Sequence, residues 1–66
     1  MKRVILADVY NDQGEMVRIE ATDPSNGEAV LDFVWDPRDE QTSENREAFR
    51  KWAASWLLRK GYETRS

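Results

Sequence analysis

One amphipathic segment sets the architecture of this chain: residues 44–60, which read ENREAFRKWAASWLLRK. Its large apolar side chains recur at the spacing of a single helical face, and this pattern predicts an α-helix. Thr42 or Ser43 can cap the first turn, and Gly61 is expected to end the helix in a left-handed conformation. The residues on the apolar face are Phe49, Trp52, Ala53, Trp56 and Leu57.

Three short runs with alternating apolar residues precede the helix, and each is typical of a β-strand. Turn-forming residues such as Gly14 and Pro24 separate the runs. The sequence therefore predicts an α+β fold in one small domain, a three-stranded antiparallel meander in the order 1-2-3 with one C-terminal α-helix packed on one face. Tyr62 is expected to pack back on Leu57, and the last few residues are expected to be loose. The predicted strands cover about residues 3–10, 15–22 and 28–35, within a domain that spans residues 1–66.

The first turn predicts a register for the first hairpin. If residues 12–14 form a three-residue loop with Gly14 left-handed, Asn11 pairs with Glu15. Counting outward from that pair then decides which side chains share a face. The side chains expected beneath the helix are Ile5, Ala7, Val9, Val17, Ile19, Ala21, Leu31, Phe33 and Trp35.

The second turn allows two loop placements, which differ by two residues in register and keep the same facing. One places Asp32 opposite Arg18, and the other places Asp32 opposite Glu20. Like charges directly opposed are unfavourable, so the first placement is the predicted one.

One helix can shield only one face of a sheet, so the other face must meet solvent, a second copy of the chain or a partner. In the predicted register, Asp8, Arg18 and Asp32 form a charged row across this uncovered face, with apolar side chains on both sides. Scattered apolar groups on a solvated sheet are one interpretation, and a contiguous apolar patch that marks an interaction site is the other. The candidate protein interface consists of Leu6, Tyr10, Met16, Arg18, Val30 and Val34.

The charge is unevenly distributed. Residues 1–45 hold four basic and eleven acidic side chains, a net charge of −7, whereas residues 46–66 hold six basic and two acidic, a net charge of +4. Part of this asymmetry complements the helix dipole. It also raises the alternative of nucleic-acid binding by the helix, although an acidic sheet disfavours that function. The alternative phosphate contacts are Arg46, Arg50, Lys51, Arg59 and Lys60.

Catalysis and metal binding are not predicted. The chain has neither histidine nor cysteine, which removes the commonest general base and the thiolate ligands of structural zinc. Asp8 and Asp32 resemble an acid–base pair in spacing, but Arg18 between them would keep both carboxylates ionised. We therefore expect no catalytic residues, no cofactor and no metal site.

The sequence predicts a cytoplasmic location without membrane contact. The apolar run that begins at Val4 is only four residues long, too short for a signal peptide or a membrane span. In its small size and acidic charge, the chain resembles in a general way the compact acidic proteins of bacteria and their phages that act by binding another protein. The function expected from the sequence is a non-enzymatic protein-binding or regulatory module. It would act through the uncovered sheet face, or form a homodimer there.

Overall fold

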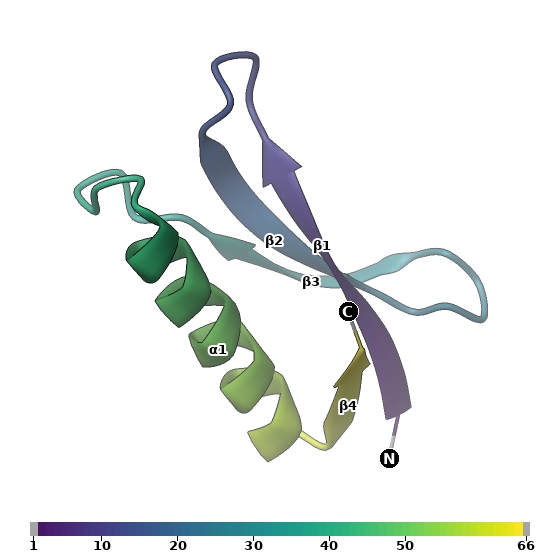
Figure 1. The fold of residues 1–66 in the computed structure, drawn as a ribbon. Coiled ribbons are helices and arrows are strands. Elements are labelled where there is room, and N and C mark those ends of the chain that lie inside the picture. The colour runs from purple at the N-terminus through teal and green to yellow at the C-terminus, as the bar shows by residue number, and fades with distance from the viewer. Residues whose placement is uncertain (1, 66) are drawn as a thin grey trace.

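The computed structural model describes residues 2–65 and shows an α+β fold with one sheet and one helix (Figure 1). Three consecutive strands form an antiparallel meander, and the helix that follows lies against one face of the sheet. The predicted meander and C-terminal helix are thus confirmed. The elements are β1 (Lys2–Tyr10), β2 (Met16–Thr22), β3 (Ala29–Val34), α1 (Ser43–Arg59) and β4 (Tyr62–Arg65).

A fourth strand extends the meander, and the sequence did not predict it. The sheet order is β3-β2-β1-β4, and β4 pairs in parallel with the first residues of β1, from Lys2 to Ile5. Gly61, with a φ of 90°, reverses the chain after the helix and returns it to the free edge of β1. The prediction that the last few residues are loose is wrong, because backbone pairing with β1 orders Tyr62–Arg65, whereas Tyr62 packs against the core as expected.

The first hairpin turns as predicted. Asn11 N donates to Glu15 O at 2.9 Å, and Gly14 has a φ of 79°. Beyond the turn, however, β2 has one residue more than β1. Tyr10 pairs with Met16 and Val9 pairs with Arg18, so Val17 has no partner on β1. Such a β-bulge reverses the facing of one strand relative to its neighbour. The predicted register is therefore correct at the turn and wrong along the rest of the hairpin.

The bulge moves residues of the first hairpin between the two faces of the sheet. Met16 lies in the core with 1% of its surface exposed, and Val4, toward the other end of β1, is buried as well. The prediction that Ile5, Ala7 and Val9 face the helix is wrong, because these residues pair with the outward-facing side of β2. Apart from Val17, the core residues predicted on β2 and β3 keep their places. The buried core consists of Val4, Met16, Ile19, Ala21, Phe33, Trp35, Ala53 and Leu57.

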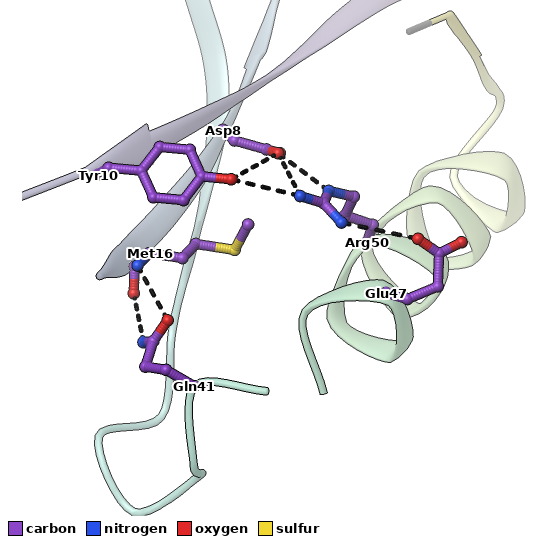
Figure 2. Close-up of polar contacts among 6 residues, drawn as sticks. All are labelled: Asp8, Tyr10, Met16, Gln41, Glu47 and Arg50. Carbon is purple, nitrogen blue, oxygen red and sulfur yellow. Dashed lines mark hydrogen bonds and ion pairs between the residues drawn. The ribbon is translucent and has the colours of Figure 1, made fainter. Parts of the chain in front are cut away.

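Gln41 pairs with the backbone of β2 where the strand passes beyond the end of β3. Its side-chain amide accepts a hydrogen bond from Met16 N at 3.0 Å and donates one to Met16 O at 2.9 Å (Figure 2). Trp35 N donates to Val17 O at 3.0 Å, and Trp35 Nε1 donates to Asp39 O at 3.3 Å. These bonds attach the loop between β3 and α1 to the sheet and satisfy backbone groups that a longer β3 would otherwise pair.

The second hairpin does not adopt the predicted register. It adopts the other one, in which two carboxylates lie opposite each other. Glu20 lies opposite Asp32, and the predicted pairing of Asp32 with Arg18 is wrong. Arg18 instead binds Glu20 along the same strand, with Nη2 2.7 Å from Oε1, and thereby offsets the repulsion between the two carboxylates. Because the two placements differ by two residues, β3 still presents Phe33 to the helix as predicted.

The helix begins and packs nearly as predicted. Thr42 is the N-cap, and its Oγ1 accepts a hydrogen bond from Asn45 N at 3.0 Å. Phe33 meets Trp52 and Trp56 edge-on, with ring centroids 5.5 and 5.6 Å apart. Trp52 was expected in the core but is 51% exposed, because it lies on the side of the helix next to β3, which is the edge strand of the sheet in residues 2–65.

The change of Met16 to glutamate tests the bulge. In the observed register Met16→Glu places a carboxylate in the core and should cost at least about 3 kcal/mol of unfolding free energy, comparable to the whole stability of so small a domain. Val34→Glu is the matched control, because Val34 is 74% exposed and its replacement should cost less than about 0.5 kcal/mol. Thermal unfolding followed by circular dichroism measures both changes. A native-like melt for Met16→Glu would mean that β2 has no bulge.

Candidate functional site

The structure separates the residues predicted to form an interface. Arg18 and Val34 lie opposite one another on the uncovered side of the sheet. Val30 is exposed at the edge of the sheet, where a second register shift interrupts the pairing of β2 with β3. These three residues are on the accessible side of β2 and β3.

The other three predicted interface residues lie on the side that faces the helix. Met16 is fully buried there, and Leu6 packs against the core. Tyr10 is partly exposed, but its hydroxyl points toward the helix, where Arg50 Nη2 donates to it at 3.3 Å (Figure 2). The predicted apolar patch is therefore not continuous, and the bulge at Val17 is the reason.

A different set of residues occupies the uncovered side, here called the open face. Two rows cross it: Val9, Arg18 and Val34 lie side by side on the three strands of the meander, and so do Ala7, Glu20 and Asp32. Sequence analysis missed the β1 members because both faces of β1 carry apolar residues, so that only the register distinguishes them. The open face consists of Ile5, Ala7, Val9, Arg18, Glu20, Thr22, Val30, Asp32 and Val34.

The open face combines exposed apolar groups with an excess of negative charge. Ile5 is 44% exposed and Val34 is 74% exposed. Arg18 neutralises Glu20, and their partly solvated ion pair is worth about 1 kcal/mol or less. Asp32 forms no hydrogen bond or ion pair through its side chain with any other described residue. One carboxylate without a partner thus lies between apolar neighbours.

An ion pair joins the sheet to the helix on the opposite side. Arg50 Nε and Nη2 donate to Asp8 Oδ2 at 2.9 and 2.7 Å, and Tyr10 OH donates to the same oxygen at 3.3 Å (Figure 2). Glu47 approaches the guanidinium from the helix, at 3.6 Å. The hydrogen bond to Asp8 raises the pKa of Arg50 above its ordinary value. The charged row predicted from Asp8, Arg18 and Asp32 does not form, because Asp8 faces the helix.

A groove of about 470 Å³ lies between this side of α1 and the edge of β1. Within residues 2–65, β4 pairs with β1 only as far as Ile5, so the edge of β1 from Leu6 to Tyr10 has no neighbouring strand. The groove carries two acidic and two basic side chains, so its charge favours no class of ligand. Its lining residues are Leu6, Asp8, Ile19, Glu47, Arg50, Lys51, Ala54 and Thr64.

The basic residues of the helix do not form one surface. Arg46 Nη1 donates to Gln41 O at 2.8 Å, Arg50 binds Asp8, and Lys60 Nζ lies 5.4 Å from the centre of the Trp56 ring. Lys51 and Arg59 are exposed. At 100° per residue, the five candidate phosphate contacts spread over about 260° of the helix circumference. The helix flank inferred from the sequence is therefore not a continuous basic patch.

Comparison of the chain with protein-family models, with curated proteins and with solved structures finds no match. In the described part of the chain, α1 is not long and apolar enough to cross a membrane.

A double-mutant cycle tests the link between sheet and helix. Asp8→Asn and Arg50→Gln should show a coupling energy of about 1 kcal/mol in urea unfolding, because the guanidinium makes two hydrogen bonds to one partly buried carboxylate. The coupling should weaken as salt is added. Asp36 and Arg38 form the comparison pair, whose side chains are 42% and 88% exposed, so their coupling should be smaller. A coupling for Asp8 and Arg50 no larger than that of the comparison pair would mean that the bridge does not hold the helix.

Proposed function

We propose that this chain is a non-enzymatic protein-binding module that acts through the open face. The observation that carries the proposal is the exposure of Ile5 and Val34 on a sheet face that no helix covers. Sheet faces with exposed apolar side chains are commonly buried against a second layer of structure. A partner, or a second copy of the chain in a homodimer, is the layer proposed here.

The charges of the open face define what the partner must offer. Asp32 has no ion-pair partner in the described residues, and Glu20 lies directly opposite it. A complementary surface would place a cation beside Asp32 and apolar side chains over Val34 and Ile5, since rim charges contribute specificity and apolar contacts contribute affinity. The open face therefore favours a protein surface that is apolar with basic residues.

A protein partner is preferred over nucleic acid because of where the charges lie. Phosphate binding draws its affinity from several cations that act together. The open face presents Arg18 already bound to Glu20, and two arginines of the helix are engaged with Asp8 and with the carbonyl of Gln41. The cations left for phosphate contacts are few and dispersed.

Charge substitutions on the open face test the proposal. Ile5→Glu and Val34→Glu should abolish homodimerisation in sedimentation experiments, or the capture of partner proteins identified by mass spectrometry, because each places a carboxylate in the apolar contact. Both variants should keep the parent's circular dichroism spectrum. Leu58→Glu is the matched control, since Leu58 is 59% exposed on the helix, away from the open face, and its replacement should leave association unchanged.

If the parent remains monomeric at high concentration, and both open-face variants capture the same proteins as the parent, the open face is only a solvated surface. The same conclusion follows if Leu58→Glu reduces association as strongly as Ile5→Glu does.

Nucleic-acid binding is tested separately by fluorescence anisotropy with random-sequence duplex DNA at about 150 mM salt. We expect no dissociation constant below about 1 μM, because phosphate contacts require more clustered cations than α1 presents. Tight binding that Lys51→Glu together with Arg59→Glu removes would overturn the preference for a protein partner. Lys2→Glu together with Arg38→Glu, the same change in net charge at two exposed residues outside α1, controls for the effect of net charge.

A further inference from the structure

A second groove, of about 360 Å³, lies beside the edge strand β3. Val34 forms one of its walls, and Phe49 and Trp52 of α1 contribute aromatic rings. Val34 and Trp52 are both more than half exposed, so the groove is open and its apolar surface is uncovered. Its lining, which we call the Trp52 groove, consists of Val34, Asp36, Asp39, Asn45, Ala48, Phe49 and Trp52.

The rim of the Trp52 groove is acidic. The lining contains two carboxylates and no basic side chain. Arg38 makes two hydrogen bonds to Asp36, Nε to Oδ1 at 3.1 Å and Nη2 to Oδ2 at 2.9 Å, which lower the pKa of the Asp36 carboxyl. Asp39 makes no side-chain hydrogen bond or ion pair with any residue in 2–65. One carboxylate at this rim is therefore hydrogen-bonded to the Arg38 guanidinium, whereas Asp39 is attracted to that guanidinium only through space and makes no hydrogen bond to it.

The aromatic wall of the Trp52 groove also lacks a cation. Trp56, one turn further along α1, has Lys60 Nζ 5.4 Å from its ring centre. Trp52 has no such neighbour among the described residues; its ring stacks on Phe49 at 6.0 Å and meets the edge of Phe33. The remaining indole surface meets solvent. Tryptophan is the aromatic ring that attracts cations most strongly.

We propose that the Trp52 groove receives an arginine or lysine side chain from a basic segment of the partner protein. The aliphatic stem of that side chain lies along Val34 and the Trp52 ring, and its charged head reaches Asp39. The inference rests on the proposed function and specifies the chemistry of the partner. Val34 belongs to both surfaces, so a partner seated on the open face reaches the groove without a gap.

The start of α1 does not prevent this. A helix N-terminus disfavours cations, and Asn45 lies in the first turn. The effect of the helix dipole decreases within one turn, however, whereas Trp52 lies in the third turn. Asp39 and Glu44 add negative charge at the same end of the helix, so the local charge favours a cation.

Nuclear magnetic resonance of the ¹⁵N-labelled chain tests the proposal with a capped peptide, acetyl-Ala-Arg-Arg-Ala-amide, at about 150 mM salt. The chain has three tryptophans, whose indole N–H signals report separately on their surroundings. The peptide should shift the Trp52 signal saturably, and the neutral analogue with citrulline in place of arginine should not. Asp39→Asn and Trp52→Leu should each weaken the peptide's affinity by at least about fivefold, because each removes one attraction for the cation. The backbone amide signal of Ala48, which lines the same groove, reports the affinity of Trp52→Leu.

Asp12→Asn is the matched control, because it removes the same charge at the tip of the first hairpin, outside the Trp52 groove. It should leave the affinity within about twofold of the parent. Equal weakening by Asp12→Asn and Asp39→Asn would mean attraction to net charge alone and would overturn the proposal, as would a Trp52 signal that the peptide does not move. A Trp52 signal that moves with protein concentration alone would assign the groove to a second copy and also overturn it.

The test distinguishes this proposal from the function on which it rests. If the peptide leaves Trp52 unmoved while Ile5→Glu still abolishes partner capture, the open face is the binding surface and the cation site is wrong. If the peptide binds as expected while Ile5→Glu and Val34→Glu capture the same partners as the parent, the groove binds cations and the function proposed for the open face is wrong.

Discussion

The β-bulge at Val17 is the constraint on which the rest of this structure depends. A sheet strand alternates its side chains strictly, so Met16 and Ile19 can face the same side only if an extra residue lies between them. The bulge brings Met16 into the core beside the residues already expected there, while Arg18 keeps its predicted outward position. Gln41 then pairs with the Met16 backbone at 3.0 and 2.9 Å, and the core is closed without leaving those groups unpaired.

The position of the bulge also determines what each side of the sheet can do. Asp8 faces the helix because of it and is bound by Arg50, so a charge that would otherwise lie among the open-face residues joins the two layers instead. Ile5 moves to the open face for the same reason. The width of the sheet has a separate effect on Trp52. Because β3 is the edge strand of the described sheet, about half of the Trp52 surface stays exposed. The open face and the Trp52 groove meet at Val34.

Local signals predicted the parts of the fold that depend on neighbouring residues. The apolar spacing around Ala53 and Leu57 indicated α1, and the residues near Gly14 indicated a three-residue turn; both are as predicted. Of the six candidate interface residues, Arg18, Val30 and Val34 lie on the open face. The sequence indicated no ion pair between Asp8 and Arg50, which are 42 residues apart, because that contact depends on the strand register.

The amino-acid sequence by itself determined the α+β class, the meander, the helix and the division of charge between them, because these follow from side-chain period, turn chemistry and composition. Only the tertiary structure decided which side chains of β1 face the helix, whether Met16 is buried, and that β4 forms and pairs with β1. Both faces of β1 carry apolar residues, so its local pattern is compatible with either facing. Packing against α1, the Asp8–Arg50 ion pair and the Gln41 amide select one of them, and those contacts exist only once the chain is folded.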